Sequence, residues 1–180
     1  MASPIITILA EGFEETEAVT PIDLLRRAGI EVLVLGLNAA TVHGSHNIPI
    51  VADGLLDEFH GDPAGIVLPG GPGHKNLLGS KVVLSLVRTI FGRGLLCAAI
   101  CAAPSVFGKA GILKGKRATC FPDVESELAG ATIVREPVVI DGTVITSRGA
   151  GTAVPFALAI IEYLKGADAA DGIASTIIYR

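Results

Sequence analysis

The chain has 180 residues, of which 50% are hydrophobic, 18% are charged and 4% are aromatic, and its formal net charge is −4. This length and composition predict a single globular domain over residues 1–180 with an aliphatic core. The mild acidity and the scattered basic residues argue against nucleic acid or an acidic membrane as a partner, and no apolar run approaches the roughly 20 residues of a membrane span.

The N-terminal residues lack the basic segment of a signal peptide and lead directly into a first apolar run at 5–10. Further short apolar runs follow at 31–37, 64–70 and 94–100. Continuous apolar runs of this kind are typical of strands in a parallel sheet that helices cover on both faces. We therefore expect these four segments to form the centre of a mostly parallel sheet.

Longer segments with apolar residues at helical spacing lie between and after these runs, at 14–29, 76–94 and 151–166. Pro21 lies inside the first of them and predicts a kink, or a short turn followed by a second helix that begins at the proline.

Towards the C-terminus, two β-branched runs flank Asp141-Gly142, which is a strong signal for a β-hairpin. Together with the alternating strands and helices, it predicts an α/β fold: a three-layer sandwich with a mostly parallel sheet and a β-hairpin excursion.

In such a sheet, ligands bind beyond the carboxyl ends of the strands. The segments at these positions are rich in glycine, carboxylate, thiol or arginine: "EGFEE" (11–15), "PGGPGHKN" (69–76), "CAAPS" (101–105) and "SRGAGT" (147–152). The sequence thus predicts a site at this edge of the sheet.

Cys101 lies where an apolar strand changes into a helix whose first turn includes Pro104. A helix N-terminus favours an anion, so we expect this position to lower the pKa of the thiol and to hold it as in a nucleophile elbow. The alternative is a buried, inert cysteine, which is the ordinary state of the residue and the one expected for Cys97 and Cys120.

The glycines of "PGG", Gly70 and Gly71, allow backbone amides to approach a ligand, although such glycines also end strands for structural reasons alone. Among the glutamates that open the first predicted helix, one turned inward against the sulfur would be able to carry a proton; otherwise they favour the helix end electrostatically.

The three cysteines are an odd number without the spacing of a disulfide framework, which is typical of a reducing compartment. We therefore expect a cytoplasmic protein. No metal or cofactor site is expected, because "PGGPG" lacks the dinucleotide-binding spacing and His43 and His46 lie in a loop without a neighbouring ligand in the sequence.

Four motifs in this order, "EETEAVTPIDLLRRAGI", "VLPGGPG", "AAICAAP" and "TSRGAGT", resemble the DJ-one (Parkinson disease protein seven-like) branch of the ThiJ/PfpI superfamily. The resemblance covers nearly the whole chain. It implies a flavodoxin-like sandwich, a homodimer and a reactive cysteine at a nucleophile elbow.

The resemblance also implies roles for single residues. Cys101 matches the nucleophilic, oxidation-sensitive cysteine, and Glu17 matches the protonated glutamate that hydrogen-bonds to it. The amides of Gly71 and Ala102 match the oxyanion pocket.

Further residues match positions around the substrate pocket, which Gly70 also lines. Arg148 matches a loop that borders the pocket, and Arg27 matches an arginine at a dimer contact near it. The chain departs from its relatives at two pocket positions: His46 stands where many carry an arginine, and Phe121 stands where some carry a histidine.

By this resemblance, we expect a Cys–Glu enzyme that converts small reactive aldehydes such as methylglyoxal without glutathione, as glyoxalases and deglycases of this type do. An intracellular protease or a glutamine amidotransferase is not favoured, because none of the four histidines follows Cys101 and the neighbouring residue is Ala102. The alternative function is an oxidative-stress sensor or chaperone-like protein in which Cys101 becomes a sulfinate.

Overall fold

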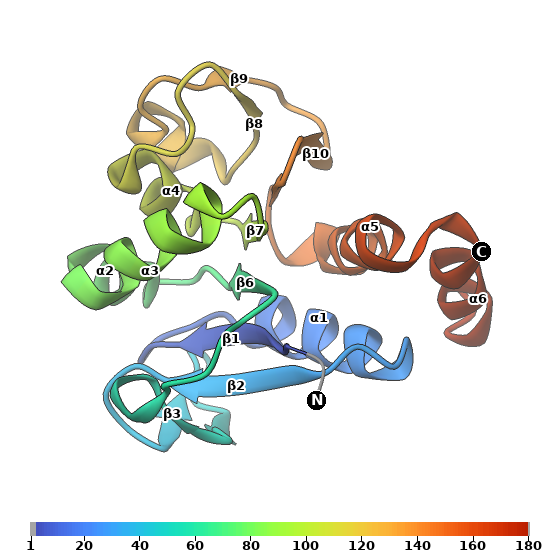
Figure 1. The fold of residues 1–180 in the computed structure, drawn as a ribbon, viewed down its shortest axis with the longest axis horizontal. Coiled ribbons are helices and arrows are strands. Elements are labelled where there is room, and N and C mark those ends of the chain that lie inside the picture. The colour runs from blue at the N-terminus through green and yellow to red at the C-terminus, as the bar shows by residue number, and fades with distance from the viewer. Residues whose placement is uncertain (1–2, 180) are drawn as a thin grey trace.

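The computed structural model describes residues 3–179 and is built around a seven-stranded sheet with the strand order β10-β11-β7-β6-β1-β2-β5 (Figure 1). All neighbouring strands in this sheet are parallel except the antiparallel edge pair β10 and β11. The predicted α/β fold with a mostly parallel sheet is therefore confirmed. Its strands are β1 (Ile5–Leu9), β2 (Val32–Gly36), β5 (Gly54–Leu55), β6 (Gly65–Leu68), β7 (Leu96–Ile100), β10 (Val138–Asp141) and β11 (Val144–Ser147).

Helices cover both faces of the sheet, which explains why β1, β6 and β7 are buried at every position. One face packs against α2, α3 and α4, and the other packs against α1, α5 and α6 (Figure 1). These helices are α1 (Glu15–Arg27), α2 (His74–Gly79), α3 (Lys81–Gly92), α4 (Pro104–Ala110), α5 (Ala153–Lys165) and α6 (Ala167–Thr176).

Alternating side chains of the central strands supply the two halves of the core. On β7, Cys97 and Ala99 face the α3 side, whereas Leu96, Ala98 and Ile100 face the α5 side. The core is aliphatic, as the composition predicts, with a few phenylalanines such as Phe107 and Phe156. Within residues 3–179, no helix has both the length and the apolar character needed to cross a bilayer.

Two helical predictions need correction, and one helix has no counterpart among the predictions. Pro21 does not begin a second helix but lies inside the continuous helix α1, where it is buried with Leu24 and Leu25. The segment predicted as one helix at 76–94 is two helices, because Ser80 adopts an extended conformation and its side chain caps the N–H of Val83 at 3.3 Å. Helix α6, after Gly166, was not predicted.

The hairpin near the C-terminus is confirmed and forms one edge of the main sheet rather than an excursion from it. Its two-residue loop is Gly142-Thr143, with Gly142 at a positive φ of 64°, so the turn lies one residue later than Asp141-Gly142.

Two small strand pairs and three short helical turns complete the described fold. The pairs are β3 (Thr41–His43) with β4 (Pro49–Val51), and β8 (Arg117–Ala118) with β9 (Thr132–Ile133). The turns are η1 (Leu56–Glu58), η2 (Pro122–Glu127) and η3 (Ala150–Thr152). The carboxyl ends of β1, β6, β7 and β11 lead into the four segments that the sequence marked as a site.

Candidate active site

Cys101 lies directly after β7 and has a left-handed backbone conformation, with a φ of 63°. This conformation is unfavourable for a residue with a Cβ and persists only where the surroundings hold it. Here the Cys101 N–H donates to the Ser147 carbonyl oxygen at 3.0 Å, and its own carbonyl oxygen accepts from the Phe121 N–H at 2.7 Å. Both backbone groups are satisfied, and the sharp turn places the side chain at the end of the sheet.

Glu17 meets this sulfur from the opposite segment. It lies in the first turn of α1, its side chain is 1% exposed, and its carboxyl group is hydrogen-bonded to the Cys101 side chain. Its Oε2 atom also accepts from the Gly70 N–H at 2.9 Å. The backbone of Glu17 is fixed in turn, because its N–H donates to Oε2 of Glu14 at 2.7 Å. The structure therefore brings together the two residues that the resemblance pairs.

The two glycines of "PGG" are both required by space, and Gly71 is also required by its conformation. A Cβ atom at position 70 would lie 2.6 Å from Cβ of Cys101 and 2.8 Å from Oε2 of Glu17. Gly71 has a φ of 80°, and a Cβ there would lie 2.5 Å from the backbone nitrogen of Glu14. This close approach lets the backbone N–H of Gly71, together with that of Ala102, donate to the Cys101 sulfur.

Burial and mutual repulsion determine the protonation of the Glu17–Cys101 pair. Burial is the main cause that raises the pKa of Glu17 to about 7, and the charge of Glu14 raises it further. Burial also raises the pKa of the Cys101 thiol to about 12, and the negative charge of Glu17 adds to this effect. The pair therefore carries a single negative charge over the range between these two pKa values.

The lowered pKa expected for Cys101 from the helix end is therefore wrong. The amides of Gly71 and Ala102 do favour the thiolate, but burial and the adjacent carboxylate outweigh them. Above a pH of about 7 the resting arrangement is a Cys101 thiol that donates to an ionised Glu17. Glu17 is therefore placed to act as the base that accepts the thiol proton.

The other cysteines have no comparable surroundings. Cys97 is 0% exposed and Cys120 is 1% exposed, and burial raises the pKa of each thiol to about 12. Both are free thiols. The structure supports the inert interpretation of these two residues.

Beside the pair lies a hollow of about 370 Å³. Phe121, which is 42% exposed, and Arg148 both line it, whereas Gly70, which was also expected at the substrate pocket, does not. The rest of the lining comes from Pro122, Gly149, Ala150, Gly151 and Thr152.

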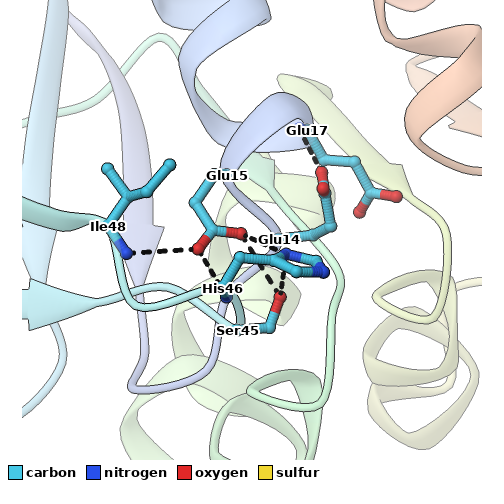
Figure 2. Close-up of polar contacts among 6 residues, drawn as sticks. All are labelled: Glu14, Glu15, Glu17, Ser45, His46 and Ile48. Atoms are coloured by element: carbon cyan, nitrogen blue, oxygen red, sulfur yellow. Dashed lines mark hydrogen bonds and ion pairs between the residues drawn. The ribbon is translucent and has the colours of Figure 1, made fainter.

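His46 is placed against Glu15 and not against Cys101 or Glu17. Figure 2 shows its ring beside Glu14 and Glu15, with the Glu17 carboxyl group turned away. The His46 Nδ1 lies 3.0 Å from Glu15 Oε2, and the His46 N–H donates to Glu15 Oε1 at 2.6 Å. Within the single chain His46 is therefore outside the contacts of the sulfur.

Hydrogen bonds around Glu15 set the charges of this neighbouring cluster. Burial alone would raise the pKa of Glu15, but the His46 ring and backbone N–H groups lower it to about 2. The Glu15 carboxylate in turn raises the pKa of His46. One ligand atom each of Glu14, Glu15 and His46 lies within 4.8 Å of the others, so the loop histidine does have carboxylate neighbours in space.

Arg27 lies in the last turn of α1, about 15 Å along the helix axis from Glu17, and pairs with Asp23 at 2.8 Å. Arg27 is therefore distant from Glu17 within its own chain, and its expected place at a dimer contact stays a prediction.

Glu14 and Ser147 were missed by sequence reasoning. Glu14 caps α1 and raises the pKa of Glu17, and its signal was its position three residues before Glu17. Ser147 anchors the elbow through a backbone carbonyl, which leaves no signature in the sequence.

Comparisons with known proteins agree with the four motifs. Residues 4–163 match the sequence profile of the DJ-1/PfpI family. The chain is 41% identical to "Protein dj-1beta" of Drosophila melanogaster over 99% of this chain and 98% of that protein. It is 36% identical to "Glutathione-independent glyoxalase DJR-1.2" of Caenorhabditis elegans over 91% of this chain and 89% of that protein.

Solved structures give the same result for the fold. The crystal structure of Drosophila melanogaster DJ-1beta covers 99% of this chain and 98% of its own, with a TM-score of 0.92 at 39% identity. The structure titled "Toxoplasma gondii DJ-1, oxidized" has a TM-score of 0.91 at 32% identity, with 98% of both chains covered.

The raised pKa of Glu17 predicts a pH dependence of stability that Glu17→Gln should lack. Because folding favours the neutral carboxyl, its contribution is fully present below the ordinary pKa of 4.5 and is lost as the pH rises through about 7. Urea unfolding should show that, between pH 4.5 and pH 8, the free energy of unfolding of the wild type falls by about 3 kcal/mol relative to that of Glu17→Gln. A constant difference between the two proteins would show that Glu17 titrates normally.

Proposed function

Because the chain belongs to the DJ-1/PfpI family, which includes a protein named as a glutathione-independent glyoxalase, we propose that it converts small 2-oxoaldehydes into hydroxy acids. Methylglyoxal would give lactate, and glyoxal would give glycolate. The observation that carries this proposal is the contact between a buried carboxyl with a pKa of about 7 and the thiol of Cys101. A base whose pKa lies near neutral pH is the kind that proton-transfer catalysis needs.

In the first step, the ionised Glu17 takes the proton of the Cys101 thiol as the sulfur attacks the aldehyde carbon. The new carbon–sulfur bond places negative charge on the aldehyde oxygen, where the N–H groups of Gly71 and Ala102 stabilise it. Glu17 then returns its proton to that oxygen, which completes a hemithioacetal and leaves the carboxylate ionised again.

In the second step, Glu17 removes the hydrogen from the carbon bonded to sulfur, which gives an enediol, and returns that proton to the neighbouring carbon, while the hydroxyl proton beside the sulfur moves to the oxygen of that neighbouring carbon. The hemithioacetal thereby becomes the thioester of a hydroxy acid. Water cleaves the thioester, releases the acid and restores the thiol. Water is the only co-reactant that this sequence requires, so we propose no cofactor.

Hydrolysis of early adducts between glyoxals and amino groups is the same chemistry on a larger substrate, and we include it in the proposed activity. The compartment that we propose is the cytoplasm, where the three free thiols would stay reduced.

The decisive measurement is lactate formation from methylglyoxal. Glu17→Gln keeps the shape of the carboxyl but removes the base, and should lower kcat/KM at least about 100-fold. Cys101→Ser should lower it further, and Cys97→Ala, which changes a cysteine away from the pair, should keep the wild-type value within about twofold. Near-wild-type lactate formation by either active-site variant would refute the assignment.

A second candidate function is an oxidation sensor, favoured by the two amides that donate to the Cys101 sulfur and by the oxidised relative from Toxoplasma gondii. In this chemistry two molecules of peroxide are reduced to water, and the thiol is oxidised through a sulfenic acid to a sulfinic acid. The amides would then stabilise the sulfinate oxygens.

Peroxide titration followed by intact-mass measurement separates the two functions. The sensor predicts a gain of two oxygen atoms in the wild type, no such gain in Cys101→Ser, and negligible lactate formation. The enzyme predicts rapid turnover of methylglyoxal by the reduced protein, with turnover lost as Cys101 is oxidised.

We also propose that the chain forms a homodimer across α1 and the β3–β4 hairpin. Apolar side chains are exposed along this face, with Val19 48%, Ile48 56% and Val51 75% exposed. Val19 and Val51 border a hollow of about 260 Å³ that Ile22 and Ile50 also line. A second copy would cover this surface, and the Arg27 of each α1 would then lie at the contact.

Light scattering during size-exclusion chromatography tests the dimer. Val51→Asp should place a charge in the contact and give a monomer mass. Val82→Asp is a matched control, since Val82 is 57% exposed on α3, and should leave the dimer intact. A wild type that runs as a monomer at micromolar concentration would overturn the proposal.

A further inference from the structure

Two residues that line the hollow, Phe121 and Gly149, connect it to the catalytic pair, although neither Cys101 nor Glu17 lines it. Its residue Phe121 donates its N–H to the Cys101 carbonyl oxygen at 2.7 Å. A Cβ atom at Gly149 would lie 3.9 Å from Oε1 of Glu17 and 3.8 Å from Cδ2 of Phe121. Gly149 thus lies next to both the Phe121 ring and the Glu17 carboxyl, and it also lines the hollow of about 370 Å³.

The hollow is lined by one cationic side chain among its seven residues, that of Arg148. Arg148 follows β11 and is half-buried; none of the hydrogen bonds or ion pairs found within residues 3–179 involves its guanidinium, and its charge acts on Glu125 and Cys120. The carboxylate of Glu125, on which the charge of Arg148 acts, is instead bound by Arg135 through both of its oxygens, at 3.0 and 2.9 Å. The positive charge of Arg148 is therefore available to a ligand in the hollow.

The geometry points to an anion subsite: we propose that Arg148 binds a carboxylate of the substrate while Cys101 attacks its carbonyl carbon. The preferred substrates would then be carbonyl compounds that carry a carboxylate, rather than neutral methylglyoxal. A guanidinium matches a carboxylate with two parallel hydrogen bonds, so Arg148 would position the substrate as well as attract it. This inference rests on the proposed nucleophile, Cys101.

Alkylation with two reagents of nearly equal shape tests the subsite without an assay of turnover. Iodoacetate carries a carboxylate, and iodoacetamide is its neutral counterpart. With each, the Cys101 sulfur bonds to the methylene carbon, iodide leaves, and Glu17 takes the thiol proton. The measured quantity is the rate for iodoacetate divided by that for iodoacetamide, normalised to the same ratio for a free cysteine derivative.

Arg148→Met should lower this normalised ratio at least about fivefold and leave the iodoacetamide rate within about twofold, because only the anionic reagent uses the guanidinium. Arg117→Met removes the same charge from β8 and should leave the ratio unchanged at about 0.15 M salt, where distant charges are screened. Arg148→Lys, which keeps the charge, should retain a ratio above that of Arg148→Met. If the methionine variant does not fold, Arg148→Gln replaces it in this comparison.

Three results would overturn the subsite. The first is a normalised ratio in Arg148→Met equal to that of the wild type. The second is a ratio in Arg148→Lys no higher than that in Arg148→Met, and the third is a ratio that Arg117→Met lowers as much as Arg148→Met does. In these cases normal labelling by iodoacetamide would leave the proposed nucleophile intact. Failure of both reagents to label Cys101 in the wild type would instead overturn the nucleophile and the subsite together.

Discussion

The contact between the Glu17 carboxyl and the Cys101 thiol is the interaction on which the site depends. Glu17 is buried, Cys101 is partly buried, and their negative charges repel each other, so the pair holds one charge between a pH of about 7 and a pH of about 12. One proton therefore remains between an oxygen and a sulfur that are hydrogen-bonded to each other. Covalent attack by the sulfur requires that this proton move to the carboxyl, and the same contact supplies the route.

The fold holds this pair in place from three directions. The end of β11 and the segment at Phe121 fix the left-handed backbone of Cys101, and the cap from Glu14 fixes the first turn of α1. Gly70 leaves just enough space for the sulfur and the carboxyl to meet. The polar contacts therefore depend on backbone positions that come from the carboxyl ends of neighbouring parallel strands.

Local patterns in the sequence predicted the parallel strands, the turn after β7 and the helix that begins at Pro104, because each depends on neighbouring residues. The break at Ser80 was missed because the continuous apolar spacing concealed its cap. Pro21 lies inside α1, where it is buried, and the sequence pattern did not show that the helix continues through it. Predictions about charge failed where partners are distant in sequence. The helix-end argument for Cys101 omitted burial and Glu17, and nothing near His46 in the sequence indicated its bond to Glu15.

The pH dependence of iodoacetamide alkylation at Cys101 tests the shared proton most directly, with modification located by peptide mass. If Glu17 is the base, the wild-type rate should rise with a midpoint near pH 7, and Glu17→Gln should move that midpoint above the ordinary thiol pKa of 9.0. A wild-type midpoint at 9.0 or higher, or a midpoint that Glu17→Gln does not move, would show that the two groups do not share a proton.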